Sequence, residues 1–249
     1  MIETGGEFGA FVKRQDLPEI SERRLVENTV RILERTELLN GDKSANCQLV
    51  VGEVQSGKTM SFTTLTTLAI DNGFRIIIYF AGTKNNLLYQ TTNRLKTDLF
   101  KGRNSKKQYK IFQNPISDES HVNKISNTLK LKNKPAILIT ILKKEKYISE
   151  LSKIFGSVEI KLALGNNGVL IIDDEADQAS LNTFARSNSK SEDWEHDEYS
   201  STYSSILSLK ASLPNHSYIQ YTATPQGPLL INLMDLLSPK FHVVLTPGK

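Results

Sequence analysis

The sequence contains a single cysteine, Cys47, and four histidines scattered along its 249 residues. One cysteine cannot form an intramolecular disulfide, and the histidines follow no recognisable metal-ligand spacing. No apolar run approaches the roughly 18 residues of a membrane span, and residues 1–13 lack the hydrophobic core of a signal peptide. These absences exclude a disulfide framework, and they predict a protein without a membrane partner in a reducing, cytoplasmic compartment.

The composition is that of an ordinary globular protein, with 39% hydrophobic and 23% charged residues. The length suits one large domain or two small ones with a sizeable core. The net charge is +4, but residues 94–161 carry 16 lysines and arginines against 6 aspartates and glutamates. Two interpretations are open for this basic segment: a set of solvated helix faces, or a surface for nucleic-acid phosphates.

Residues 52–59, GEVQSGKT, match the phosphate-loop pattern G-x-x-x-x-G-K-[ST] at every specified position. The apolar residues 49–51 precede the loop as a short strand, and residues 60–70 contain no Gly or Pro and continue as a helix. In this context backbone amides face a phosphate, Lys58 reaches the β- and γ-phosphates, and the Thr59 hydroxyl binds the accompanying Mg²⁺. The residues expected to bind the nucleotide are Gly52, Gln55, Ser56, Gly57, Lys58 and Thr59.

Strands alternate with helices along the rest of the chain, which implies right-handed parallel crossovers and an α/β layer fold with ligands at the carboxyl ends of the strands. We expect an N-terminal helical extension (residues 1–44) packed on a core domain (residues 45–249). A mobile acidic loop is expected at about residues 186–200. The predicted strands are 49–51, 75–81, 109–113, 135–142, 169–172, 218–222 and 241–245, and the predicted helices are 19–39, 60–70, 85–100, 118–131, 143–155, 202–213 and 229–237.

A buried strand ends in a cluster of acids in the stretch VLIIDDEAD, residues 169–177. Because side chains alternate along a strand, Asp173 and Asp174 point to opposite faces, and at most one of them can face a metal directly. We assign Asp174 to Mg²⁺ and Glu175 to the attacking water, so Lys58 and Glu175 are the candidate catalytic residues. An isolated acid cluster would indicate only a solvated helix start, but this one follows a buried strand downstream of a phosphate loop.

A third motif, Thr222-Ala223-Thr224-Pro225, follows the predicted strand 218–222. Small hydroxyl residues at a strand end can hydrogen-bond acids across a site and link its state to a movement. A TATP sequence alone is usually just a turn. It becomes informative because it comes after the phosphate loop and the acids.

The motifs GEVQSGKT, DDEAD and YTATPQ, in this order, resemble the first RecA-like lobe of superfamily-two helicases. The forms QSGKT, DDEADQASLN and QYTATPQG resemble the Z-one domain family of restriction and phage-defence systems. The resemblance covers residues 48–245 and implies a three-layer P-loop NTPase fold with a mostly parallel central sheet flanked by helices. It also implies that Asp177 hydrogen-bonds the coupling residues Thr222 and Thr224. Candidate nucleic-acid contacts are Thr83 and Lys84 in GTKNNLLYQ, and Thr140 at the end of PAILIT.

By this resemblance the chain is an ATP-binding lobe of a nucleic-acid-dependent, helicase-like ATPase that uses Mg²⁺. DNA is expected rather than RNA, with a nuclease or methyltransferase of the same system as a further partner. Such motors cleave ATP between two lobes, and no segment after Thr224 is long enough to be the second, arginine-bearing lobe. We therefore expect a fragment or truncated product with weak activity that needs a second lobe or a downstream segment.

The alternative function is a stand-alone nucleotide-binding regulatory module that hydrolyses little and acts through protein contacts. A GTPase is disfavoured, because guanine recognition would need an N-K-x-D stretch and Asn133-Lys134-Pro135-Ala136 lacks its Asp. An upstream glutamine motif that reads adenine is also not evident, since Gln48 lies inside the predicted strand. The base of the nucleotide is therefore assigned from the resemblance.

Overall fold

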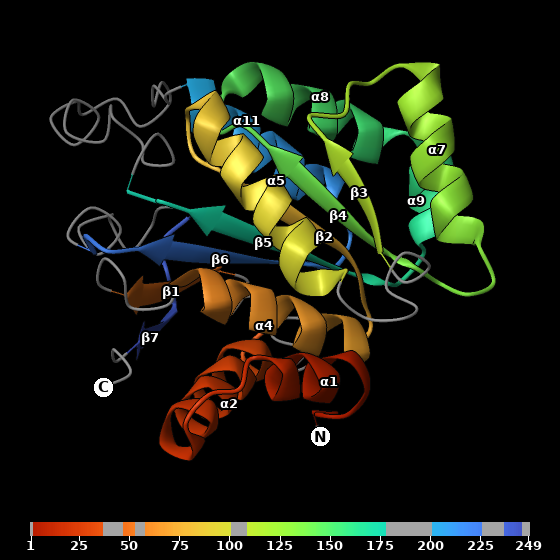
Figure 1. The fold of residues 1–249 in the computed structure, drawn as a ribbon. Helices are drawn as coiled ribbons and strands as arrows, with labels where there is room; N and C mark the ends of the chain where they lie inside the picture. Colours follow the sequence, from red (N-terminus) through yellow and green to blue (C-terminus); the bar gives the residue numbers. More distant parts are fainter. Residues whose placement is uncertain are drawn as a thin grey trace, which may run out of the picture.

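Seven strands of the described chain form one sheet in the computed structural model, and every neighbouring pair is parallel (Figure 1). The structure describes residues 2–36, 47–52, 58–100, 109–177, 201–225 and 237–245. The strands are β1 (Cys47–Gly52), β2 (Phe74–Phe80), β3 (Tyr109–Gln113), β4 (Ala136–Ile141), β5 (Gly168–Asp174), β6 (His216–Thr222) and β7 (Phe241–Leu245). Their order is β3-β4-β2-β5-β6-β1-β7, so β6 lies between β1, which precedes the phosphate-loop sequence, and the acid-bearing β5.

Helices cover both faces of the sheet and give the fold three layers (Figure 1). One face carries α4 (Lys58–Asp71) and α5 (Asn85–Leu99), with α1 (Gly6–Arg14) and α2 (Glu19–Glu34) packed outside α4. The other face carries α7 (Glu119–Lys130), α8 (Glu145–Gly156), α9 (Val158–Leu164) and α11 (Ser201–Ser212). None of the described helices combines the length and hydrophobicity that a membrane crossing needs. The predicted α/β fold with a parallel central sheet is confirmed.

The strands are buried on both faces because consecutive side chains, rather than alternate ones, are apolar. In β2, for example, Ile76, Ile77 and Ile78 are all fully buried. Ile77 packs in the hydrophobic cluster shared with α4 and α5, whereas Ile76 and Ile78 pack in the cluster shared with α7, α8 and α11. The position of a side chain along its strand therefore decides which of the two cores it joins.

All seven predicted strands are present, each within two residues of its expected limits. The helix predicted over residues 19–39 ends at Glu34, and the helix predicted from Lys143 begins only at Glu145. Lys143 is excluded from that helix because its side chain is buried beside the strand ends. Helices α1 and α9 are additional to the prediction. The acidic loop at residues 186–200 and all but the last residue of the helix predicted over residues 229–237 lie outside the described residues.

Helices α1 and α2 pack directly on α4, the helix that follows the phosphate-loop sequence. Phe8 of α1 joins the same hydrophobic cluster as Phe62 of α4. Asp71, at the end of α4, accepts hydrogen bonds from the backbone amides of Glu7 (3.2 Å) and Phe8 (2.9 Å) and so satisfies two donors at the start of α1. The boundary between extension and core stays a prediction, because residues 37–46 lie outside the described chain.

Candidate nucleotide site at the carboxyl edge of the sheet

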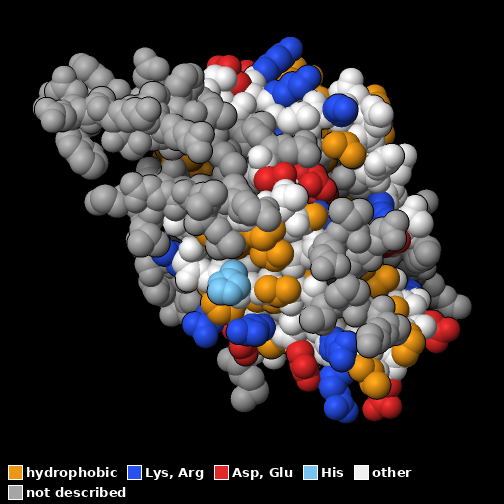
Figure 2. Space-filling model, turned by 90° about the vertical axis from the view of Figure 1, so that its left-hand side faces the viewer, with side chains coloured by type: hydrophobic (Ala, Val, Ile, Leu, Met, Phe, Trp, Pro, Cys, Tyr) orange, Lys and Arg blue, Asp and Glu red, His pale blue; other side chains and the backbone are white. Residues whose placement is uncertain are grey.

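The carboxyl ends of the parallel strands meet along one edge of the sheet, which faces the viewer in Figure 2. β1 ends at Gly52, β5 at Asp174 and β6 at Thr222, so the strands that carry the three sequence motifs end together. Figure 2 shows acidic side chains gathered near the middle of this face, with lysines and arginines mainly toward its margins. The topology therefore brings the three motifs to one place, as ligand sites in parallel sheets require.

The described part of the phosphate-loop sequence consists of Gly52, which ends β1, and Lys58 and Thr59, which begin α4. The first turn of a helix has free backbone amides, and its dipole makes that end partly positive. The start of α4 is therefore suited to bind an anionic phosphate group. The other predicted contacts, Gln55, Ser56 and Gly57, lie outside the described residues and stay predictions.

The two neighbouring acids at the end of β5 face opposite sides of the sheet, as side-chain alternation requires. Asp173 is fully buried, accepts a hydrogen bond from the Tyr218 hydroxyl and forms an ion pair with Lys143. Asp174 instead lines a pocket on the side of α4 and α5. Burial raises the pKa of Asp174, and the nearby Glu175 carboxylate raises it further. Of the two acids, Asp174 is the one placed to meet a metal ion.

Lys58 and Glu175, the two candidate catalytic residues, form an ion pair in this structure. The Lys58 ammonium lies 3.3 Å from Glu175 Oε1, and the two side chains are 13% and 34% exposed. Glu175 has a left-handed backbone conformation, with φ of 53°, which is strained for a residue other than glycine. A phosphate bound at the start of α4 would compete with Glu175 for the lysine and release the carboxylate toward the pocket.

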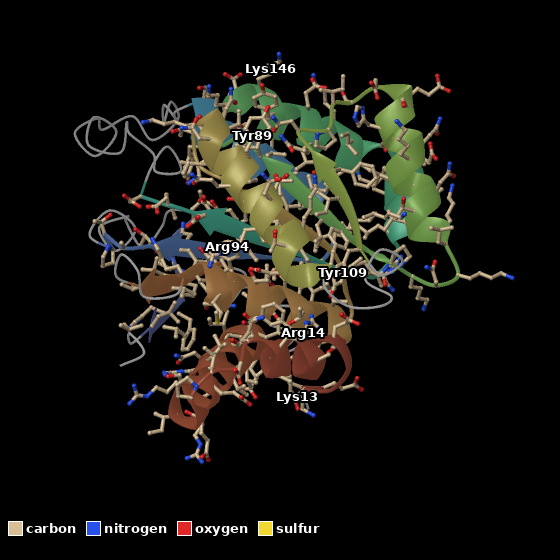
Figure 3. The ribbon with its side chains drawn as sticks, in the orientation of Figure 1. Lys13, Arg14, Tyr89, Arg94, Tyr109 and Lys146 are labelled. Atoms are coloured by element: carbon tan, nitrogen blue, oxygen red, sulfur yellow. The ribbon has the colours of Figure 1, made fainter. Side chains whose placement is uncertain are left out.

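A pocket of about 140 Å³ opens between the start of α4, the end of β2, α5 and the end of β5. Its lining includes Thr59, Asp174, Glu175 and, from α5, Arg94. Figure 3 shows Arg94 on the part of α5 that faces α4. The volume is below that of pockets for whole drug-sized ligands, roughly 300 Å³ or more. The pocket, whose described lining includes both acidic and basic side chains, therefore suits phosphate groups and an ion.

The pocket residues fit a magnesium ion that arrives with a nucleotide. The Thr59 hydroxyl and the Asp174 carboxylate are oxygen ligands, which Mg²⁺ prefers, and both line the pocket. Within the described ranges, no cluster of three or more His, Cys, Asp or Glu residues could hold a metal by itself. Mg²⁺ commonly keeps several waters and is held by one or two carboxylates plus substrate phosphates. Thr59 and Asp174 could therefore hold an ion that nucleotide phosphates also bind.

Asp177 is hydrogen-bonded to both threonines of the third motif. Thr222 Oγ1 donates to one carboxylate oxygen of Asp177 at 2.7 Å, and Thr224 Oγ1 donates to the other at 2.8 Å. The Thr224 amide also donates to Thr222 Oγ1 at 2.9 Å. Burial acts to raise the pKa of Asp177, but the bonds from Thr222 and Thr224, a backbone hydrogen bond and the charge of Lys143 together hold the pKa below its usual value. The hydrogen bonds implied by the resemblance are thus present, and the coupling role stays a proposal.

The three candidate nucleic-acid residues differ in how far they are exposed to solvent. Thr83 and Lys84 lie in the loop between β2 and α5, where Thr83 is partly exposed and Lys84 is exposed. The prediction for Thr140 is wrong, because this side chain is fully buried inside β4. Its hydroxyl shares a hydrogen bond of 2.8 Å with Thr92 of α5, so it packs a helix onto the sheet and cannot reach a nucleic acid. Thr83 and Lys84 stay as predictions.

Part of the basic segment is engaged in contacts with the protein itself. Lys130 pairs with Glu159 at 3.7 Å, Lys153 pairs with Glu150 at 2.7 Å, and Lys143 is buried. Other members, Lys101, Arg103, Lys106 and Lys107, lie outside the described residues. Both interpretations of the segment, solvated helix faces and a phosphate-binding surface, therefore stay predictions.

Lys143 is the chief site residue that the sequence patterns did not single out. It follows a predicted buried strand at the expected start of a helix, where a lysine is ordinarily solvated. In the structure its ammonium donates hydrogen bonds to the carbonyl oxygens of Asp174 (2.8 Å) and Glu175 (2.7 Å). The available signal was a lysine just past a buried parallel strand, at the same edge of the sheet as an acid cluster.

No protein-family model and no curated protein matches the chain. Among solved structures it is similar to one described as the crystal structure of the DUF1998 helicase MrfA, with a TM-score of 0.59 and 13% identity. That likeness covers 99% of this chain and 33% of the helicase, so the chain spans about a third of the helicase's length. A second structure, described as a prototypical ATPase from the type III secretion system of pathogenic bacteria, shares 12% identity over 82% of this chain and 45% of its own. Its TM-score of 0.31 is too low to support an argument. The first likeness shows the fold alone, a parallel sheet with helices on both faces.

Proposed function

We propose that this chain is the ATP-binding lobe of a nucleic-acid-dependent, helicase-like ATPase that works with Mg²⁺. The observation that carries the proposal is the pocket shared by Thr59 from the phosphate-loop sequence and by Asp174 and Glu175. In addition, Asp177 accepts a hydrogen bond from Thr222 of the third motif. The Z-one resemblance extends the proposal to a restriction or phage-defence system with a nuclease or methyltransferase partner.

In the proposed mechanism, each residue at the carboxyl edge has one task. Lys58 and the first amides of α4 hold the β- and γ-phosphates, and Thr59 and Asp174 hold the magnesium. When bound, that ion neutralises negative charge that develops on the phosphates. Glu175, released from Lys58, orients or deprotonates the water that attacks the γ-phosphate. Asp177 with its threonines links this state to movement of the lobe.

Full turnover is proposed to need a group from outside this lobe. An arginine that stabilises the transferring phosphoryl group contributes about 10³- to 10⁵-fold in turnover in related chemistry. We propose that a second RecA-like lobe, or a partner protein, supplies it, so this chain alone binds ATP much better than it hydrolyses it. Arg94 also lines the pocket and forms an exposed ion pair with Asp98 at 3.7 Å, a weak contact that a phosphate can replace.

A regulatory module is the second candidate function, and the ion pair of Lys58 with Glu175 favours it. This pair holds the candidate base against the phosphate-binding lysine, which is a resting arrangement. In a regulatory module, the displacement of Glu175 by a phosphate would itself be the signal. Hydrolysis would then be dispensable, and protein contacts would carry the output.

The experiment that tests the proposal measures thermal unfolding of the chain with and without Mg²⁺–ATP. At about 100 times its dissociation constant, a ligand that binds only the folded state stabilises it by roughly 2.7 kcal/mol. Lys58→Ala should abolish this stabilisation, because it removes the charge that meets the phosphates. Lys153→Ala, an exposed lysine on α8, is the matched control and should keep it.

An equal response in Lys58→Ala and the control would place the nucleotide elsewhere and contradict the proposal. The same titration with single-stranded DNA and with its RNA counterpart separates the two candidate functions. Under the helicase-like proposal, nucleic acid and ATP change each other's affinity by the same factor. Independent binding would favour the regulatory module.

A further inference from the structure

The ammonium group of Lys143 is fully enclosed by three acceptors at the end of β5. It pairs with the Asp173 carboxylate and donates to the backbone carbonyls of Asp174 at 2.8 Å and Glu175 at 2.7 Å. An ammonium has three N–H donors and no acceptor, and two of these donors bond the backbone on either side of Glu175. On its other side, Asp173 accepts the Tyr218 hydroxyl. The Lys143 side chain therefore contacts the backbone at Asp174 and Glu175, which we call the acidic turn, as well as the Asp173 carboxylate.

The contacts of Lys143 fall on either side of the strained residue. Glu175 has φ of 53°, and the two carbonyls bonded by Lys143 are its own and that of Asp174. The next amide, that of Ala176, donates to the Tyr221 carbonyl at 3.0 Å. A left-handed conformation at a glutamate persists only where its surroundings impose it. Among the described residues, Lys143 contacts both peptide groups next to this bend with its side chain.

Lys143 also connects the acidic turn to the loop that holds Thr83 and Lys84. Its backbone amide donates to the Gly82 carbonyl at 2.8 Å. Gly82 has φ of +75°, a left-handed conformation that a side chain at this position would strain. One residue thus contacts the candidate nucleic-acid loop through its backbone and the candidate base through its side chain.

We infer that Lys143 is a positioning residue: it holds Glu175 in the left-handed bend that directs the carboxylate to Lys58 and the pocket, and it joins this bend to the Gly82 loop. The inference rests on the proposed function, because a position for Glu175 matters only where Glu175 acts on a substrate. A buried ion pair by itself gives no such role, since well-packed apolar residues can replace one without loss of stability. What distinguishes Lys143 is its pair of bonds to the backbone around Glu175.

The test uses a double variant, Lys143→Met with Asp173→Asn, which removes both buried charges together and leaves no carboxylate buried alone. We expect single-turnover hydrolysis of ATP to fall about 10²-fold, the size of effect expected when a reacting group shifts by about 1 Å. The dissociation constant of Mg²⁺–ATP should stay nearly unchanged, because Lys58, Thr59 and Asp174 remain. Tyr218→Phe is the matched control: it removes a bond to Asp173, leaves Lys143 in place and should keep the wild-type rate.

A second variant, Lys143→Gln with Asp173→Asn, retains an amide group that can donate to the same carbonyls. We expect it to recover part of the lost turnover, which a purely structural role would not predict. Double variants that fold and hydrolyse ATP at the wild-type rate would overturn the inference. So would a parallel loss of nucleotide affinity and turnover.

The conformation of Glu175 provides a readout that does not depend on hydrolysis. In a crystal structure of the Lys143→Met, Asp173→Asn variant, Glu175 should leave the left-handed region and its carboxylate should move away from Lys58. An unchanged positive φ at Glu175 would overturn the inference even if activity fell. Absence of ATP binding and hydrolysis in the unmodified chain would instead refute the proposed function, while the Glu175 conformation would still test Lys143.

Discussion

The two faces of the sheet treat neighbouring carboxylates in opposite ways at its carboxyl edge. On the side of α8 and α11, Asp173 is fully buried with Lys143 and Tyr218 as partners. On the side of α4 and α5, Asp174 and Glu175 line an open pocket, and burial together with the neighbouring charge raises the pKa of Asp174. On the side of α8 and α11, the partners of the carboxylate lie within the protein. On the side of α4 and α5, the carboxylates face an open pocket, where a ligand could contact them.

Two adjacent residues, Asp173 and Asp174, thus differ in whether their carboxylates are paired inside the protein or face the pocket. A buried carboxylate that is paired inside the protein becomes costly only when its partner is removed, and it needs no ligand. A carboxylate with a raised pKa is held in its charged form at a cost, which a bound cation relieves. The alternation of side chains along β5 is enough to assign one role to Asp173 and the other to Asp174.

The largest predicted effect contrasts Asp173→Ala with Asp174→Ala in stability. Asp173→Ala should lower the free energy of unfolding by roughly 3–5 kcal/mol, because it leaves the Lys143 ammonium buried without its carboxylate. Asp174→Ala should leave the stability unchanged or raise it, since the raised pKa means that the ionised carboxylate opposes folding at neutral pH. Urea denaturation of both variants at pH 7 measures the difference. Equal losses would show that the two faces do not differ as described.

A second prediction concerns the pH dependence of stability at His216, which lies at the start of β6, where no ligand site is proposed. Burial, with a smaller contribution from Lys210, lowers the pKa of His216 to about 4. The unfolded chain binds a proton at His216 near pH 6.5, whereas the folded chain binds it only near pH 4. The free energy of unfolding is therefore unaffected by this group above pH 6.5 and decreases as the pH falls toward 4. The loss should reach at most about 3 kcal/mol. His216→Asn should flatten this part of the pH–stability curve, whereas His242→Asn, at an exposed position of β7, should not.

The smallest predicted effect concerns the two threonines that bind Asp177. Thr222 is fully buried, so Thr222→Val should cost about 1–2 kcal/mol through the lost hydrogen bond to a charged group. Thr224→Val should cost less than about 1 kcal/mol, because its bond is exposed to water. Thermal unfolding without nucleotide measures both. A larger loss at Thr224 would contradict the order of burial on which this prediction rests.

The strands and the positions of Lys58, Thr59 and Asp174 at the carboxyl edge of the sheet could be predicted because they depend on local sequence. Buried strands appear as apolar runs, and the phosphate-loop spacing fixes Lys58 and Thr59 at the start of a helix. The separation of Asp173 from Asp174 follows from the period of a strand alone. These features need no knowledge of which strands are neighbours.

Lys143 and Thr140 could not be assigned because their environments depend on the order of strands. β2 lies between β4, which precedes Lys143, and β5, which carries the acids, so the contact of Lys143 with Glu175 spans two strand positions. Thr140 is buried by Thr92, a helix residue far from it in sequence. Sequence periodicity gives the face of a strand but not the side chain that covers it.

The packing of α1 on α4 has a practical consequence for dividing this chain into pieces. Phe8 and Phe11 of α1 and Leu33 of α2 share one hydrophobic cluster with Phe62, which lies one turn beyond Lys58 on α4. A shortened version that starts at β1 would expose this apolar surface on the helix that begins at the candidate phosphate site. Helices α1 and α2 therefore form the outer layer over α4, the helix that begins at the candidate phosphate site. Minimal expression boundaries should include them.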